Sequence, residues 1–260
     1  MSPAGRYGHT AMVMSSYLAV ARYPSPMADI SASVSPVDPL DDLNYRAAVV
    51  DLLAVLAYGE LSAFERLCDD AALAPTLSDK AEVAAMACAE FGHFRQIRER
   101  LDELGVDVDE AMRPFVAPLD AFHASTAPAD WLEGLVKAYV GDSIAADFYR
   151  EIAQHLDEKT RSLVLAVFED TGHSEFVVEK VRAAIAADPR VGGRLALWGR
   201  RLMGEALSQA QLVAAERDAL AGLLAGGVGR PGVDLMELGR MFTRLTEEHT
   251  KRMAALGLAA

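Results

Sequence analysis

Residues 79–104 read DKAEVAAMACAEFGHFRQIRERLDEL, a run of strong helix formers with no internal proline. Glu90-Phe91-Gly92-His93 lies at its middle. Because positions i and i+3 share one face of a helix, Glu90 and His93 can point at a common atom. Further along the chain, Asp170-Thr171-Gly172-His173 repeats the pattern. The sequence therefore predicts two helices that each offer an acid and a histidine on one face.

Long helices are predicted on both sides of these motifs, because stretches rich in Ala, Leu, Glu, Arg and Val contain few Gly or Pro. Lengths of about 40–48 Å for the first four suit a four-helix bundle. No stretch shows the two-residue alternation of a β-strand, so the expected fold class is all-α. The bundle helices are expected over 42–73, 79–104, 128–156 and 158–187, and two additional C-terminal helices over 188–224 and 234–256.

The intervening segments carry breaking residues. Residues 102–128 contain Pro114 and Pro118 and are expected to form a linker that crosses between two antiparallel helix pairs. Residues 226–232 are rich in glycine and predict a loop. Residues 1–40 are rich in proline and serine and lack periodicity, which predicts a disordered N-terminal tail. The remaining residues, 41–260, then form one helical bundle domain.

Composition excludes several classes of protein. With 52% hydrophobic residues the chain can bury a sizeable core, and its net charge of −13 argues against a uniformly basic coat for nucleic acid. Two cysteines argue against a disulfide-rich secreted fold. No apolar run approaches the roughly 20 residues that span a bilayer, so we expect a cytoplasmic protein without a membrane segment.

Each predicted bundle helix carries an acid near its middle. Unpaired carboxylates inside a bundle are costly, so they must be neutral, paired with cations or bound to metal. One acid from each of two helices, together with an acid-x-x-His motif from each of the other two, is the ligand pattern of di-iron carboxylate proteins. The predicted ligands of two non-haem iron ions are Glu60, Glu90, His93, Asp142, Asp170 and His173.

Two further patterns bear on this prediction. A third acid-x-x-His motif joins Asp120 to His123, but it lies in the proline-flanked linker and is interpreted as a chance match. A glycine directly precedes four of the predicted ligands, at Gly59, Gly92, Gly141 and Gly172. Since a glycine inside a helix costs about 1 kcal/mol relative to alanine, these glycines indicate either close helix approach or room for a ligand.

On these motifs the chain resembles the ferritin-like superfamily and, more narrowly, the tRNA methylthio-isopentenyl-adenosine hydroxylase (MiaE-like) family, over about residues 42–255. The resemblance implies a di-iron centre that activates O2 and hydroxylates an unactivated C–H bond. It implies that the six predicted ligands are the catalytic iron ligands, with Glu90 and Asp170 bridging the two ions. The family pattern usually has Glu where this chain has Asp142 and Asp170.

Partners and alternatives follow from the same features. The chain shows no sequence fingerprint for binding flavin or nicotinamide, so a hydroxylase of this kind would need a separate electron donor. The alternatives are a ferritin-like iron-oxidising or peroxide-handling protein and a metal-free helical scaffold. Residues 190–260 hold ten basic and seven acidic side chains, unlike the acidic body of the chain, and either contact tRNA or form an ordinary helical cap. The basic residues singled out are Arg194, Arg200, Arg201, Arg240, Arg244, Lys251 and Arg252.

Overall fold

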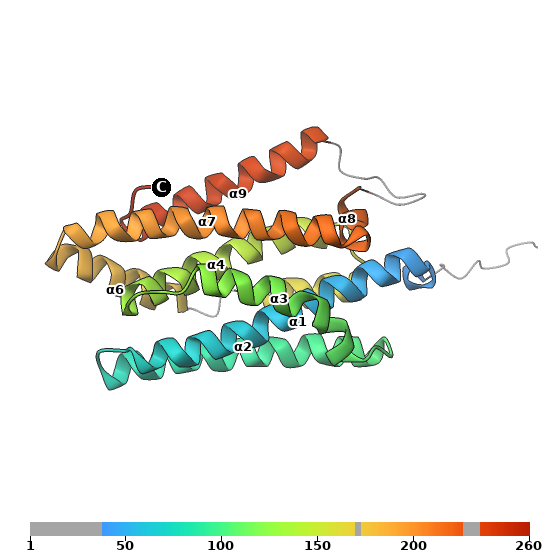
Figure 1. Cartoon of the computed structure of the whole chain (residues 1–260), viewed down its shortest axis with the longest axis horizontal. Helices are drawn as coiled ribbons and strands as arrows, with labels where there is room; N and C mark the ends of the chain where they lie inside the picture. The colour runs from blue at the N-terminus through green and yellow to red at the C-terminus, as the bar shows by residue number, and fades with distance from the viewer. Residues whose placement is uncertain (1–37, 170–172, 226–234) are drawn as a thin grey trace, which may run out of the picture. The chain divides into compact units, whose positions relative to one another are not determined.

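A computed structural model describes residues 38–169, 173–225 and 235–260 (Figure 1). Within these residues nine α-helices and one 3-10 turn are present and β-strands are absent, which confirms the predicted all-α class. The predicted N-terminal tail, up to residue 37, and the predicted loop 226–232 lie outside the described residues. The helices are α1 (Leu43–Ala72), α2 (Leu77–Glu103), α3 (Val108–Ser125), α4 (Trp131–Ala153), α5 (Glu158–Val167), α6 (His173–Ala187), α7 (Arg190–Glu216), α8 (Asp218–Ala225) and α9 (Leu235–Ala255).

Helices α1 and α2 form a long antiparallel pair, side by side in Figure 1. Asp42 caps α1 by accepting hydrogen bonds from the backbone N–H groups of Asn44 and Tyr45. Thr76 caps α2 in the same way, at the N–H of Asp79. Gly105 stops α2 with a positive φ of 68°, a conformation that glycine adopts without strain. Both helices therefore match the expected ranges to within two residues.

The predicted helix over 158–187 is interrupted, so its continuity was a wrong expectation. Asp157 caps α5 as expected, but α5 ends at Val167 and α6 begins at His173. The Phe168 carbonyl accepts a hydrogen bond from Arg150 of α4, at 2.6 Å, instead of continuing the helix. After Phe168 and Glu169 the sequence continues Asp-Thr-Gly, three residues that are poor helix formers. The fourth rod of the bundle is thus made of two helices.

The predicted linker 102–128 is largely a helix, which corrects a second expectation. Asp107 caps α3 by accepting from the N–H of Glu110, and both Pro114 and Pro118 lie inside the helix. Each proline removes one backbone hydrogen bond. The helix forms because three side chains at helical spacing are buried against the bundle, Val108, Met112 and Phe115. Tertiary packing therefore outweighs the local propensity of the prolines.

The predicted helix over 188–224 has a break of one residue. α7 ends at Glu216, and Arg217 leaves helical geometry with φ −128° and ψ 85° before α8 begins. The Arg217 guanidinium donates to the Asp51 carboxylate of α1, with its Nε atom 3.0 Å from Oδ2. This ion pair holds the turn between α7 and α8 against α1.

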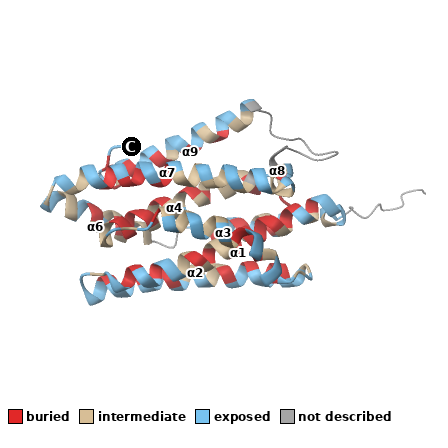
Figure 2. Ribbon diagram, viewed as in Figure 1, coloured by how far each residue is buried: buried red, intermediate tan, exposed pale blue. Residues whose placement is uncertain are grey.

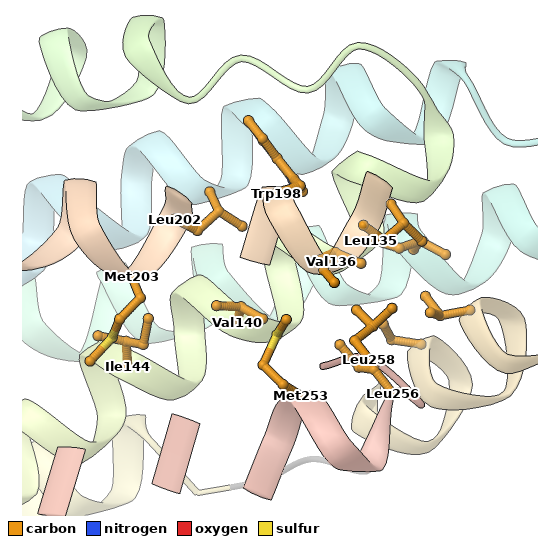
Figure 3. Packing of buried hydrophobic residues seen from close by; sticks show 14 of the residues in the cluster. Leu135, Val136, Val140, Ile144, Trp198, Leu202, Met203, Met253, Leu256 and Leu258 are labelled. Atoms are coloured by element: carbon orange, nitrogen blue, oxygen red, sulfur yellow. The ribbon is translucent and has the colours of Figure 1, made fainter. Parts of the chain in front are cut away.

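A large part of the hydrophobic core lies between α4, α7 and α9. Figure 3 shows their side chains interdigitating, and Figure 2 shows the buried stripe that each helix turns inward. The indole N–H of Trp198 donates to the Glu133 carbonyl at 3.0 Å, which ties α7 to α4. Among the largest fully buried side chains here are Leu135, Leu195, Leu202, Met253 and Leu256. The two C-terminal helices α7 and α9 thus cover α4.

Two expectations drawn from composition have clear outcomes. Cys68 and Cys88 are free thiols on exposed positions. α1 is long and apolar enough to cross a membrane by length and composition alone, which corrects the expectation that no apolar run approaches that length. More than half of its most apolar window, 56%, is buried against neighbouring helices, so the packing of the bundle accounts for its hydropathy.

Candidate metal centre

Three of the predicted ligands converge where α1 meets α2. Candidate ligand atoms of Glu60, Glu90 and His93 all lie within 4.8 Å of one another. The Nδ1 atom of His93 is 3.3 Å from Oε2 of Glu60 and 3.7 Å from Oε2 of Glu90. Glu60 is only 6% exposed, which is unusual for an acidic side chain. The i, i+3 spacing on α2 therefore brings Glu90 and His93 together as predicted, and α1 supplies Glu60.

The pKa values of the three residues in this cluster reflect the cost of burying charge. Burial, the largest cause, and the Glu90 carboxylate raise the pKa of Glu60 well above its usual range, against the opposing hydrogen bond with His93. Burial also acts to raise the pKa of Glu90, but its hydrogen bonds with His93 and Glu60 outweigh burial and lower it. Hydrogen bonds to Glu60 and then to Glu90 raise the pKa of His93 to about 10. Without a metal, an imidazolium supplies the positive charge that the carboxylates require.

This donor set fits a divalent metal ion. Two carboxylates and one imidazole are hard and borderline ligands of the kind that bind iron, manganese or zinc. A divalent cation would displace the shared protons and neutralise both carboxylates. The cluster thus has the composition of one half of a di-iron site, one acid from one helix and an acid-x-x-His pair from its neighbour.

The predicted second half is placed less completely. His173 is the first residue of α6, lines the same cavity as the cluster, and lies close enough for its charge to lower the pKa of Glu90. Asp142 also lines this cavity, but its position on α4 is exposed and it does not belong to the cluster of three. Asp170 lies outside the described residues. The structure therefore brings Glu60, Glu90 and His93 together, with His173 nearby.

A cavity of about 580 Å³ opens beside the cluster. Its wall combines the cluster residues with apolar side chains of α1 and α4, including Leu56, Leu67 and Ile144. Gly59 and Gly141 line it, and a Cβ atom added at either position would meet no atom within 4 Å. Of the two roles that the sequence allowed for these glycines, the geometry favours room for a ligand over close helix approach.

The third acid-x-x-His motif lies on α3, not in a linker, and its two residues point to different partners. The Tyr58 hydroxyl donates to Asp120 at 2.7 Å, whereas His123 Nε2 lies 3.1 Å from Ser62 Oγ. Because the Ser62 hydroxyl donates to the Gly59 carbonyl, we assign the Nε2 proton to His123 as the donor to Ser62. Burial first, then the Lys137 and Arg66 charges, lower the pKa of His123 to about 4. This neutral imidazole lines the cavity outside the metal cluster.

Sequence reasoning missed two charged residues of the same cavity, Lys137 and Asp70. Both are buried, at 8% and 9% exposure. A signal was present, because Lys137 interrupts the apolar run Gly134-Leu-Val-Lys-Ala-Tyr-Val on a bundle helix. A lone lysine in such a run is either snorkelling to solvent or placed for a buried partner.

The family of the chain follows from comparison with known proteins. No curated protein matches the sequence. A family model described as a ferritin-like domain of actinomycetes matches residues 43–227, from the start of α1 to just beyond α8. The match covers every helix that carries a predicted ligand, and it agrees with the all-α bundle and the carboxylate-histidine cluster. The chain therefore belongs to the ferritin-like domain family of actinomycetes.

Proposed function

We propose that this chain is a non-haem di-iron monooxygenase, which activates O2 and hydroxylates an unactivated C–H bond of an organic substrate. The observation that carries the proposal is the meeting of Glu60, Glu90 and His93 on the wall of a 580 Å³ cavity. A cavity of this size is typical of sites for small organic molecules. The resemblance to tRNA methylthio-isopentenyl-adenosine hydroxylases supports the same reaction class.

The residues of the chain have separable roles in this proposal. Glu60, Glu90 and His93 hold one metal ion, and His173, with Asp142 and Asp170, completes the second position. Bound iron would supply the redox chemistry with O2. The apolar wall of the cavity excludes water and holds the substrate against the metal cluster, while a separate protein donates electrons.

The cavity favours this function over an iron-oxidising or peroxide-handling role. Iron and peroxide need only a narrow polar path, whereas the wall of this cavity as a whole is more apolar than polar. A metal-free scaffold is also less favoured, since Glu60 is buried beside a second carboxylate at a cost that metal binding would offset.

Contact with tRNA through the basic C-terminal helices stays a prediction. All seven basic side chains singled out there have partners within the chain: Arg200 and Arg201 donate to backbone carbonyls, and the other five pair with acids. Five of the seven charges are therefore already paired with acids, which lowers the positive charge that this segment presents to phosphate groups. If tRNA binds, its affinity will fall steeply with salt.

The test combines metal loading with a labelled-oxygen assay. The full chain is loaded with ferrous iron without air, supplied with a chemical reductant and cyclohexane, and exposed to isotopically labelled O2. We expect labelled cyclohexanol, absent in Glu90→Ala and retained in Glu99→Ala, an exposed acid of the same helix. Sustained oxidation of excess ferrous iron without labelled product would contradict the proposal and support the iron-oxidising alternative.

A further inference from the structure

Two opposite charges are buried at one end of the cavity without an ion pair between them. Lys137 on α4 and Asp70 on α1 are 8% and 9% exposed, and both line the cavity. Asp70 packs against the backbone of Gly134, where an added Cβ atom would lie 3.0 Å from the carboxylate. Gly134 and Lys137 are three residues apart on α4 and share a face, so the ammonium and the carboxylate face the same end of the cavity.

The Lys137 ammonium is incompletely satisfied. It donates one hydrogen bond, at 2.8 Å, to the Thr126 carbonyl, and it lies 5.8 Å from the centroid of the Phe122 ring. An ammonium has three N–H donors. Among the residues that the structure describes, no other acceptor binds Lys137 and no side chain donates a hydrogen bond to the Asp70 carboxylate. Two donors of Lys137 and the oxygens of Asp70 are thus available to a ligand.

The arginines on the cavity wall differ from Lys137 in this respect. Arg66 pairs with Glu65 and Asp69, and Arg150 and Arg252 pair with Asp147. Burial is the main reason that the pKa of Lys137 falls to about 8, and the charge of Asp70 offsets it only in part. A buried ammonium without a contacting counterion is destabilising, so this position has a purpose other than stability.

The other end of the same cavity holds the metal cluster. Asp70 lies ten residues after Glu60 on α1, a rise of about 15 Å along the helix. The cavity-lining residues of α1 between them are the apolar Ala63 and Leu67 and the arginine Arg66, whose guanidinium is paired with acids of α1. A ligand that reaches from the charged pair to the cluster therefore has a polar head and an apolar body.

We propose that the cavity binds an amphipathic carboxylic acid, with its head group between Lys137 and Asp70 and its hydrocarbon chain extending past Leu67 toward Glu60. A carboxyl group fits both partners, because one oxygen accepts from the ammonium while the other shares a proton with the Asp70 carboxylate. As a statement of substrate class this inference rests on the proposed function, but binding itself requires neither iron nor turnover.

The test is calorimetric titration of the metal-free full chain with decanoate, decanol and decanamide. We expect decanoate to bind at least about tenfold more tightly than decanol, since the alcohol can accept from the ammonium but lacks the negative charge that strengthens this hydrogen bond. Each methylene removed from the acid should weaken binding about threefold to fourfold. Equal binding of decanoate and decanol, tighter binding of decanamide, or no binding of decanoate would each overturn the inference.

Variants localise the head group. Lys137→Met should remove the preference for decanoate over decanol, whereas Lys251→Met, at an exposed lysine of α9, should leave it unchanged. Asp70→Asn should tighten decanoate binding several-fold, because it removes a negative charge and adds an N–H donor. If Lys137→Met does not fold, Asp70→Asn still tests the position of the head group. Unchanged or weaker binding of decanoate to Asp70→Asn would contradict that position.

The result separates this inference from the proposed function. Decanoate binding that depends on Lys137, in a chain that takes up no iron, would support the ligand class and contradict the oxygenase. Iron uptake and labelled product without a preference for decanoate over decanol would support the oxygenase and contradict the ligand class. Tight, salt-sensitive binding of tRNA that decanoate does not displace would place the polar substrate outside this cavity and overturn the inference.

Discussion

The Nδ1 atom of His93 on α2 lies 3.3 Å from the Oε2 atom of Glu60 on α1, so an imidazole and a buried carboxylate from two helices share one hydrogen-bonding position. The Oε2 atom of Glu90 lies 3.7 Å from the same nitrogen. Two carboxylates held this close repel each other unless a cation lies between them. In the metal-free chain a proton on His93 has this role, and a metal ion would replace it.

This relationship predicts that the metal cluster reduces stability when it is empty. Glu60→Gln replaces a buried acid, whose raised pKa reflects the cost of ionising it there, with an uncharged amide that still forms hydrogen bonds. The metal-free variant should therefore be as stable as the natural chain or more stable by about 1–2 kcal/mol. Thermal unfolding without ferrous iron measures the stability of the metal-free proteins, and unfolding with ferrous iron measures how far the metal stabilises them. The natural chain should gain melting temperature with iron, and Glu60→Gln should not. Glu99→Gln is the matched control, and a loss of iron response in it would contradict the assignment.

Asp70 predicts a specific dependence of stability on pH. Burial, the largest cause, raises its pKa to about 6, so the folded chain binds this proton more tightly than the unfolded chain does. The contribution of Asp70 to stability is therefore full below about pH 4 and is lost as the pH rises through 6. Asp70→Asn should remove this decline and be more stable at pH 7 by about 1–3 kcal/mol. Urea unfolding between pH 4 and 7 measures this decline, with Asp102→Asn, at an exposed acid of α2, as control. An unchanged slope in Asp70→Asn would contradict the prediction.

The Arg217–Asp51 ion pair predicts a large loss of stability. Asp51 is 8% exposed, and Arg217 also lies 5.4 Å from the centroid of the Phe115 ring. Arg217→Ala leaves the Asp51 carboxylate buried without its partner, which should cost about 2–4 kcal/mol of unfolding free energy. Arg113→Ala, at an exposed pair within α3, should cost less than about 0.5 kcal/mol. Similar losses from both variants, measured by urea unfolding, would contradict this difference.

Two glycines predict opposite effects of the same substitution. At Gly59 the helix is regular and an added Cβ atom meets open space, so Gly59→Ala should stabilise the chain by about 0.5–1 kcal/mol. At Gly105, with φ 68°, a Cβ atom is strained, so Gly105→Ala should destabilise it by about 1–2 kcal/mol. Chemical unfolding of both variants tests the pair. A loss of stability at Gly59 would show that the open space there is occupied in solution.

Much of the fold and half of the metal site could be predicted from the sequence because both depend on helical periodicity. The i, i+3 spacing of Glu90 and His93 is local, and the match of Glu60 in height on the neighbouring helix follows from one turn between two long rods. The prolines of α3 misled the prediction because burial of Phe115 and its neighbours, a tertiary effect, outweighs their local cost.

Other features depend on contacts that no local pattern encodes. The end of α5 depends on Arg150 reaching the Phe168 carbonyl across the bundle. The charged end of the cavity depends on α1 and α4 approaching closely at Gly134, which places Asp70 near Lys137 although the two are far apart in sequence.

The central claim, that Glu60, Glu90 and His93 bind metal, is tested most directly by metal analysis. The full chain, His93→Ala and Glu99→Ala are each loaded with ferrous iron without air, freed of excess metal and analysed for iron per chain. We predict about two irons for the natural chain and for Glu99→Ala, and less than one for His93→Ala. Equal iron content in all three proteins, or no iron in the natural chain, would contradict the account.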